Sequence, residues 1–315
     1  MKKLKIPGGV WSATPTPLTS DYRLDKASVH RMVAHQLKMG VSGLMVAGTC
    51  GEGPWLGVRD REALVRTSVA AAAGRLCIAV QVTDNSVART LEQIEQAAAW
   101  GGQIAVVAQP YYLLNATPDL LLAFYQEIAR RSPLPVGFYD RGKGSPYMMP
   151  DAHILEMLCE PNIVMAKDSA HLPEHRALFV QARQRRPELV LLEGWEFDSI
   201  PALEAGYDGV LFGGAIFNAG LAHRLILAVR AGDQKEAQRL QARMNDLMLR
   251  VYGGATIECW LTGLKELLVR MEIFSTNKNL LEYPLTETCL REINAAVSGA
   301  DGLGYRSDLF EPAPT

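Results

Sequence analysis

The stretch PVGFYDRGKGSPYMMPDAHILEMLCEPNIVMAK, residues 135–167, contains one complete strand–helix–strand unit. Its apolar runs, Pro135–Tyr139 and Ile163–Lys167, are predicted strands, and Ala152–Cys159 between them has the spacing of an amphipathic helix. Two strands joined through a helix are predicted to be parallel. The second strand ends in Lys167, whose ammonium group is costly to bury. Lys167 therefore bears both on the fold, as the end of a predicted strand, and on the function, as a buried amine.

The same unit recurs along the chain. Six further apolar runs are predicted strands: Val10–Ala13, Gly43–Val46, Leu76–Gln81, Ile104–Ala108, Val190–Glu193 and Gly209–Phe212. Helical patterns lie between strands at Ala27–Met39, Asp60–Ala73, Val87–Trp100, Pro118–Arg131 and His175–Gln184. Eight α/β units at intervals of roughly 20–30 residues predict a closed (β/α)8 barrel, the TIM barrel. A doubly wound open sheet is the alternative, but ATPTPLTSD stands where its glycine-rich phosphate loop would follow the first strand.

The period changes after the eighth unit. Four helical patterns follow with no predicted strand between them: Gly220–Arg230, Gln234–Val251, Cys259–Met271 and Thr286–Val297. We therefore expect residues 1–230 to form a catalytic barrel and residues 231–300 a C-terminal helical extension. Residues 301–315 are rich in glycine and proline, so they are expected to be a tail or a loosely packed arm.

Length, charge and cysteine content limit the class of protein. The chain has 315 residues, is 48% hydrophobic and carries a net charge of −2, with acids and bases mixed along it. It has no basic stripe typical of nucleic-acid binding, no apolar stretch of the roughly 20 residues that span a membrane, and no signal-peptide pattern. Its five cysteines are odd in number and widely spaced, which favours reduced thiols over a disulfide framework. We expect a cytoplasmic protein without nucleic-acid or membrane partners.

Residues that follow the predicted strands are candidates for the active site, because barrel enzymes carry it at the carboxyl ends of their strands. The candidates are Thr49 and Cys50 in AGTCGEG, Tyr111 and Tyr112 in QPYYLLN, Tyr139 with Asp140 and Arg141, Lys167, and the glycine turn of FGGAIFN. Desolvation disfavours the charged form of an amine, and a neutral amine can attack a carbonyl carbon. The iminium then withdraws electrons while hydroxyl groups carry protons. This set predicts Schiff-base chemistry on a small-molecule 2-oxo acid, with no cofactor and no metal.

Five motifs resemble those of the dihydrodipicolinate synthase / N-acetylneuraminate lyase family. They are ATPTPL, AGTCGEGPWL, PYY, LPVGFYD and IVMAKDS, in the family's order and spacing over residues 8–298. The resemblance implies a homotetramer or dimer of (β/α)8 barrels in which Lys167 forms the Schiff base. It further implies that Tyr139 donates and accepts protons, that Thr49 relays them, and that Tyr112 reaches into the neighbouring subunit's site.

The departures from the family pattern concern the substrate. Cys50 stands where family members usually have a second hydroxyl residue that binds the substrate carboxylate. Its backbone N–H remains, and the glycine turns that contain Gly48 and Gly213 offer further N–H groups for a carboxylate. The arginine of synthase-type members falls near Gly144. Arg141 or Lys143 could take its place in substrate binding, but neither matches it by position.

The sequence KDS after the lysine strand, in place of KEA, resembles members that cleave or dehydrate sugar-derived 2-oxo acids. We therefore expect a Schiff-base-forming lyase that acts on pyruvate or a larger 2-oxo acid. Its reaction would be aldol cleavage or condensation, or dehydration of a 2-oxo-3-deoxy sugar acid. The alternatives are dihydrodipicolinate synthase, which condenses pyruvate with aspartate semialdehyde, and a non-catalytic barrel that binds 2-oxo acids.

Structural explanations compete with these roles. Lys167 could pair with a buried carboxylate such as Asp168 and serve only the fold. His171 and His175 have the i, i+4 spacing of metal ligands on a helix, which is typical of a metal site, but no third ligand is evident. Glu52 is expected to hold loop backbone and to take no part in catalysis.

Overall fold

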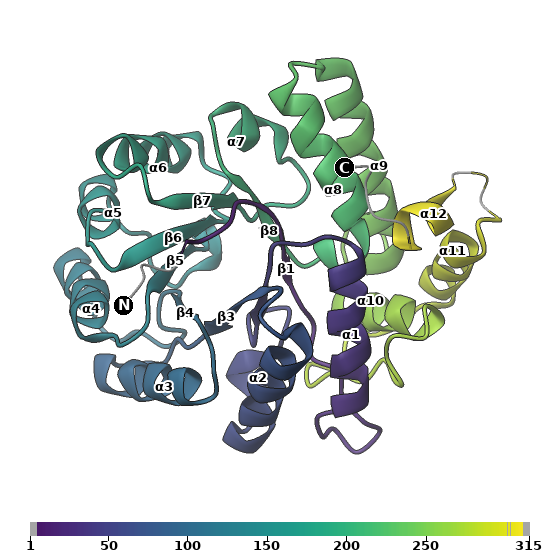
Figure 1. The fold of residues 1–315 in the computed structure, drawn as a ribbon, viewed down its shortest axis with the longest axis horizontal. Coiled ribbons are helices and arrows are strands. Elements are labelled where there is room, and N and C mark those ends of the chain that lie inside the picture. Colours follow the sequence, from purple (N-terminus) through teal and green to yellow (C-terminus); the bar gives the residue numbers. More distant parts are fainter. Residues whose placement is uncertain (1–4, 301, 303, 311–315) are drawn as a thin grey trace.

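The barrel that the sequence predicts is closed and parallel in this computed structural model, which describes residues 5–300, 302 and 304–310 (Figure 1). Its strands are β1 (Gly9–Ala13), β2 (Gly43–Val46), β3 (Cys77–Gln81), β4 (Ile104–Val107), β5 (Val136–Asp140), β6 (Ile163–Asp168), β7 (Val190–Glu193) and β8 (Gly209–Phe212). Each strand pairs with the next in sequence, and β8 pairs with β1. The (β/α)8 prediction is therefore confirmed.

Helices alternate with these strands and surround them. They are α1 (Lys26–Lys38), α2 (Val58–Ala72), α3 (Val87–Ala99), α4 (Pro118–Arg131), α5 (Asp151–Leu158), α6 (Pro173–Arg185), α7 (Ile200–Glu204) and α8 (Ala215–Arg230), with 3₁₀ turns η1 (Gly53–Trp55) and η2 (Gly142–Gly144). Helix α7 has five residues, too few for a helical period to be recognised in the sequence. Helix α8 begins five residues before the predicted Gly220. Its first turn is fully buried, so no exposed polar stripe marks the start of the helix in the sequence.

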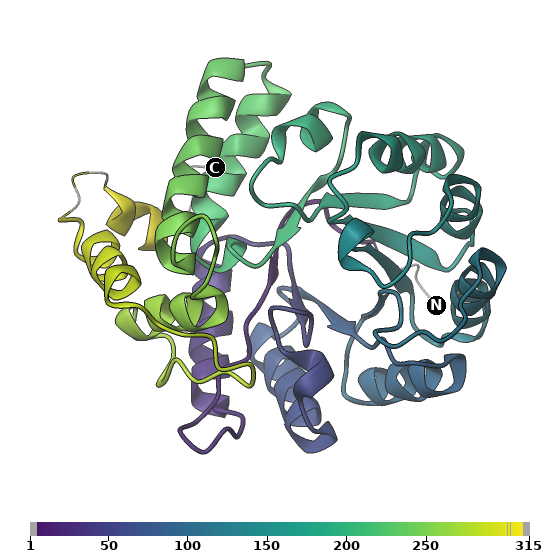
Figure 2. The same cartoon turned by 180° about the vertical axis from the view of Figure 1, so that it is seen from behind.

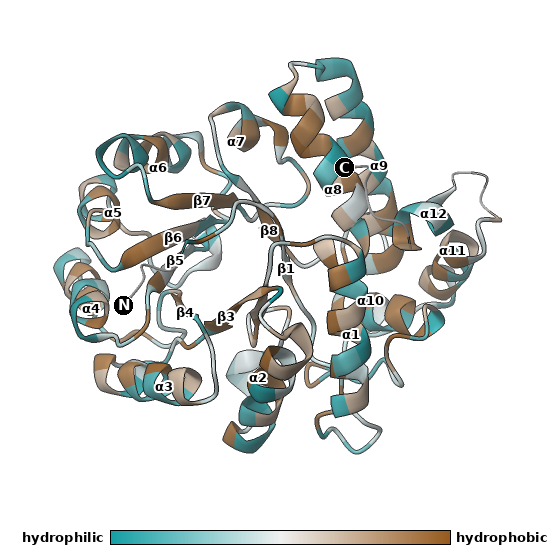
Figure 3. Ribbon diagram, viewed as in Figure 1, coloured by the Kyte–Doolittle hydropathy of each residue, from teal (hydrophilic) through white to brown (hydrophobic). Residues whose placement is uncertain are grey.

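Apolar side chains form two layers. One layer fills the barrel interior and includes Trp11, Met45, Val106, Met165 and Leu211. The other lies between the strands and the surrounding helices. Figure 3 shows the consequence: strands such as β6 and β7 are mainly hydrophobic before their charged ends, whereas the surrounding helices carry separate apolar and polar stripes. Because successive strand residues alternate between the two layers, neighbouring strand-end residues face different environments.

The C-terminal helices gather on one side of the barrel, beside α1 and α8 (Figures 1 and 2). They are α9 (Gln234–Tyr252), α10 (Trp260–Arg270), α11 (Glu287–Ser298) and α12 (Tyr305–Phe310). Helix α12 lies within the predicted tail, and its Tyr305 and Leu309 are buried while Asp308 pairs with Arg224 at 2.6 Å. Residues 301, 303 and 311–315 of the predicted tail lie outside the described residues. The division into domains at residues 230 and 300 stays a prediction.

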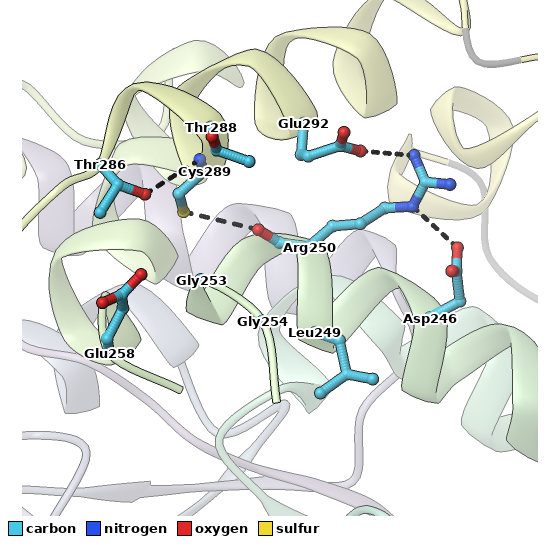
Figure 4. Close-up of a pocket in the computed structure, with 10 residues that line it drawn as sticks. All are labelled: Asp246, Leu249, Arg250, Gly253, Gly254, Glu258, Thr286, Thr288, Cys289 and Glu292. Carbon is cyan, nitrogen blue, oxygen red and sulfur yellow. Dashed lines mark hydrogen bonds and ion pairs between the residues drawn. The ribbon is translucent and has the colours of Figure 1, made fainter. Parts of the chain in front are cut away.

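A cavity of about 250 Å³ lies between α9 and α11 in the extension (Figure 4). Arg250 crosses it and pairs with Asp246 and Glu292, each at 2.8 Å, so the guanidinium links the two helices. None of the residues lining the cavity follows a barrel strand. Within the described part of the chain, no helix combines the length and apolar character needed to cross a membrane.

Candidate active site

Lys167 and Tyr139 are cross-strand neighbours at the carboxyl ends of β6 and β5. Side chains at the same register position of paired strands point to the same face, and Tyr139 belongs to the layer inside the barrel. The Nζ atom of Lys167 lies 4.3 Å from the centroid of the Tyr139 ring. Lys167 is only 5% exposed and Tyr139 only 8%. The structure thus brings together the amine and the phenol that the sequence singles out.

No carboxylate forms an ion pair with Lys167 among the described residues. Asp168, the partner considered from the sequence, belongs to the opposite face of β6. Its carboxylate accepts hydrogen bonds from the Tyr207 hydroxyl at 2.8 Å and the Ala170 backbone N–H at 3.0 Å. The proposed Lys167–Asp168 pair is therefore wrong, because the alternation of strand residues separates the two side chains.

Space for the lysine side chain depends on Gly194, directly after β7. A Cβ atom at this position would lie 2.9 Å from Cε of Lys167 and 2.1 Å from Oγ of Ser169. Real Cβ atoms do not approach other atoms so closely, so any larger residue would displace one of these groups. Gly194 is a site residue that the sequence analysis missed.

Opposing effects set the pKa of Tyr139. Burial alone raises it, but the positive charges of Lys167 and Arg141 and the nearby hydroxyls of Thr49 and Ser169 favour the phenolate. Together they bring the pKa of Tyr139 below its usual value. A phenol with a lowered pKa accepts and returns protons more readily near neutral pH.

Thr49 and Tyr111 extend this group of hydroxyls. Oγ1 of Thr49 is buried and has no hydrogen bond of normal geometry in the described part of the chain, yet it lies near the hydroxyls of both Tyr139 and Tyr111. The Tyr111 hydroxyl accepts a hydrogen bond from Nε2 of Gln81 at 3.0 Å. Burial raises the pKa of Tyr111 to about 12, so this hydroxyl is protonated at neutral pH.

The two adjacent tyrosines have different surroundings. Tyr111 lies at the site, whereas the Tyr112 side chain is 70% exposed and lies outside this group. The role predicted for Tyr112 requires a neighbouring subunit, so it stays a prediction. Gln81, a polar residue at the end of the apolar strand CIAVQ, is the sequence signal that could have pointed to Tyr111.

The predicted substrate-binding residues lie around the same strand ends. Arg141 places its guanidinium carbon 5.5 Å from the centroid of the Tyr111 ring. Cys50 and Gly213 are adjacent, since a Cβ atom on Gly213 would lie 3.2 Å from the Cys50 sulfur. Burial, followed by the charges of nearby glutamates, raises the pKa of the Cys50 thiol to about 12, so it is neutral. Gly48 lies against Met45 of the barrel interior: a Cβ atom on Gly48 would lie 2.6 Å from the methyl carbon of Met45.

The two histidines considered as metal ligands are separated. His175 is buried, and its Nδ1 lies 2.6 Å from an Asp140 carboxylate oxygen. His171 precedes α6, has a φ of 52° and stacks on Trp195 with ring centroids 5.4 Å apart. The two therefore do not share one face of a helix, because Pro173 begins α6 after His171. No group of three histidine, cysteine or acidic side chains suited to a metal ion occurs among the described residues.

Glu52 takes no part in the group around Lys167. It is fully buried, pairs with Lys265 of α10 and accepts a hydrogen bond from the backbone N–H of Leu280. The loop that carries Thr49 and Cys50 is thereby attached to the C-terminal extension.

Comparisons with known proteins identify the family of this chain. The profile of the Dihydrodipicolinate synthetase family matches residues 6–298. A 4-hydroxy-tetrahydrodipicolinate synthase of Xanthomonas campestris is 31% identical over 239 residues, which are 76% of this chain and 78% of the relative. An N-acetylneuraminate lyase of Rhizobium meliloti is 27% identical over 75% of this chain and 78% of the relative. A dihydrodipicolinate synthase structure from Bacteroides thetaiotaomicron has a TM-score of 0.84 at 26% identity, covering 95% of this chain and 100% of that one. The chain belongs to the dihydrodipicolinate synthetase family.

Proposed function

We propose that this chain is a class I lyase that forms a Schiff base with pyruvate or a larger 2-oxo acid. The observation that carries the proposal is the buried Lys167 amine. It lies 4.3 Å from the Tyr139 ring centroid and forms no ion pair with a carboxylate among the described residues. Imine formation needs a nucleophilic amine and a nearby group that moves protons. Membership of a family whose relatives include a synthase and a lyase supports the same chemistry.

The steps follow from the positions of the hydroxyls. The Lys167 nitrogen attacks C2 of the 2-oxo acid. The C2 oxygen takes one proton from this nitrogen and one from Tyr139, and it then leaves as water. The resulting iminium accepts the electron pair when the C3–H or C3–C4 bond breaks, and an enamine forms. Tyr139 accepts the proton released in this step, and Thr49 lies between Tyr139 and Tyr111 to relay it.

The carboxylate of the substrate would be held by neutral donors. Backbone N–H groups of the turns containing Gly48, Cys50 and Gly213 are suited to an anion. The neutral Cys50 thiol does not repel a carboxylate, as a thiolate would. Arg141, whose guanidinium carbon lies 5.5 Å from the Tyr111 ring centroid, would bind a polar or anionic group on the distal part of the substrate.

The synthase reaction, condensation of pyruvate with aspartate semialdehyde, is the second candidate. The relative from Xanthomonas campestris, which is named as a 4-hydroxy-tetrahydrodipicolinate synthase, favours it. Gly144, at the place of the arginine typical of synthase-type members, counts against it. Adding aspartate semialdehyde or a panel of sugar-derived aldehydes to enzyme with pyruvate separates the two: product from the semialdehyde alone would replace our first candidate with the second.

Exchange of the pyruvate methyl protons in D₂O tests the shared chemistry without knowledge of the second substrate. Enamine formation and its reversal replace C3 protons by deuterium, which NMR detects. We expect exchange by the unmodified chain and none above background by Lys167→Met. No exchange with pyruvate or with larger 2-oxo acids would refute the proposed function.

We further propose a homo-oligomer, either a tetramer or a dimer, located in the cytoplasm. Support for assembly comes from three large, exposed hydrophobic side chains between β4 and the first turn of α4: Tyr112 at 70%, Leu114 at 75% and Leu120 at 61%. All five cysteines are free, which is compatible with a reducing compartment. Sedimentation of Tyr112→Arg against the unmodified chain tests the interface; identical sedimentation would remove Tyr112 from it.

A further inference from the structure

A buried pair, His175–Asp140, lies on the outer side of the strand that carries Tyr139. Asp140 is the next residue of β5, so it points towards the helices while Tyr139 points into the barrel. Its Oδ2 lies 2.6 Å from Nδ1 of His175 on α6. The two residues are 6% and 3% exposed. The mechanism above uses neither side chain.

Asp140 connects this pair to the loop after β5. Its Oδ1 accepts a hydrogen bond from the Gly142 N–H at 2.8 Å, and its backbone carbonyl accepts one from the Ser169 N–H at 2.8 Å. Gly142 has a φ of 50°, and a Cβ there would lie 2.7 Å from Cα of Ala170. The backbone on both sides of Arg141 is therefore fixed by Asp140 and by close packing.

Arg141 affects both tyrosines from this position. Its guanidinium lies over the Tyr111 ring at 5.5 Å, and its charge favours the ionised form of Tyr139. Coulomb energy falls with distance, so a displaced guanidinium would help Tyr139 less. The position of Arg141 thus contributes to the proton chemistry at Lys167.

We propose that His175 is a positioning residue which, through Asp140, holds Arg141 beside Tyr139 and Tyr111. The proposal rests on the proposed function, because Tyr139 must carry the proton for the position of Arg141 to matter. His175 touches neither the Lys167 amine nor the hydroxyl groups of the site; its effect passes through the carboxylate of Asp140 and the turn at Gly142.

Other ionisable groups also act on Tyr139 and on His175. The groups near Tyr139 are Lys167 and Arg141, with Tyr111 adjacent. The groups that act on His175 are Asp140, Asp168 and Asp151.

The test is the pH profile of pyruvate C3 exchange in four variants: His175→Leu, His175→Asn, Arg141→Ala and the double variant His175→Leu/Arg141→Ala. For His175→Leu we expect pyruvate C3 exchange to slow by about ten-fold. The part of the pH profile in which the exchange rate rises should move to higher pH, because Tyr139 ionises less readily. Asparagine can donate from Nδ2 where histidine donates from Nδ1, so His175→Asn should restore most of the rate. His153→Leu is the matched control, since His153 also lies near an aspartate, Asp119 at 3.2 Å, but belongs to α5 away from β5.

The double variant separates an effect of His175 through Arg141 from a general loss of structure. If His175 acts through Arg141, His175→Leu should cost less than about two-fold when Arg141 is already alanine. An equal cost in both backgrounds, or an unchanged profile in His175→Leu, would overturn the proposal. If His175→Leu does not fold, Asp140→Asn carries the same comparison. Absence of exchange in the unmodified chain would refute the proposed function itself, and with it this role, whereas normal exchange with no effect at residue 175 refutes the positioning role alone.

Discussion

Lys167 and Lys265 are both buried, but their partners differ. Lys265, on α10, is fully buried, pairs with Glu52 and donates a hydrogen bond to the Lys278 carbonyl at 2.7 Å. Lys167, at the end of β6, has the Tyr139 ring beside its amine and forms no ion pair among the described residues, although its charge acts on the buried carboxyl of Glu196. Burial lowers the pKa of Lys265, although the charge of Glu52 opposes this effect.

The difference indicates which lysine serves the fold and which serves chemistry. A buried ammonium is tolerated when a carboxylate and further hydrogen bonds compensate for lost hydration. Lys265 has both, and it attaches the extension to the loop that carries Thr49. Lys167 has no ion-paired carboxylate among the described residues, so no such pair occupies its amine, which is therefore available to attack a carbonyl carbon.

Lys167→Met should have the largest effect on activity. We expect pyruvate exchange to fall by about 10⁴-fold or more, because the covalent intermediate cannot form. The thermal unfolding midpoint should change little, since the substitution leaves no buried charge without a partner. NMR exchange and circular dichroism measure the two quantities. If a folded Lys167→Met variant still exchanged the pyruvate protons, another residue would have to be the nucleophile.

Lys265→Met should mainly affect stability. We expect the free energy of unfolding to fall by about 3–5 kcal/mol, because Glu52 would remain buried without its partner. Urea unfolding measures the loss, and Glu52→Gln/Lys265→Met should recover part of it, since a neutral amide costs less to bury. A single variant as stable as the parent chain would mean that the pair does not hold the extension.

Tyr139→Phe should separate imine formation from proton transfer at Lys167. We expect C3 exchange to slow by about 10²–10³-fold, since the proton carrier is lost while the amine remains. Tyr111→Phe and Tyr112→Phe are the matched pair: a larger loss from Tyr111→Phe favours a relay within one chain. If Tyr112→Phe costs more, the relay passes through a neighbouring subunit instead.

Glu193 at the end of β7 should make a smaller contribution, which depends on pH, to the free energy of unfolding. It is fully buried opposite Asp168 in the β6–β7 register, and burial, followed by the charge of Asp168, raises its pKa to about 8. The folded chain therefore holds this carboxyl neutral, whereas the unfolded chain ionises it near the usual value of 4.5. Its contribution to stability is complete below that value and is lost as pH rises towards about 8.

Glu193→Gln removes this titration. Between about pH 6 and about pH 8, the unfolding free energy should fall less in Glu193→Gln than in the parent chain. Urea unfolding at both pH values measures the difference. Equal slopes in the two proteins would show that Glu193 is ionised in the folded chain.

Local patterns predict the barrel and the central residues of the site well. The apolar runs are four to six residues long, and helices with their own period separate them, so β2, β7 and β8 match their predicted bounds. Lys167 and Tyr139 are recognisable because each ends such a run. Both facts depend only on residues near in sequence.

Contacts between distant residues are what the sequence does not reveal. Glu52 and Lys265 are 213 positions apart, and Asp140 and His175 are 35 apart. Either lysine could have been the paired one, since composition around a lysine does not specify which carboxylate the fold brings to it. The choice between Tyr111 and Tyr112 likewise depends on how the loop after β4 turns.

Reductive trapping tests the contrast between the two lysines most directly. The chain is incubated with pyruvate and borohydride, digested, and its peptides are analysed by mass spectrometry. We predict a reduced pyruvate adduct on Lys167 and none on Lys265. An adduct on another lysine, or none with any of several 2-oxo acids, would contradict the claim that the unpaired amine at the end of β6 is the nucleophile.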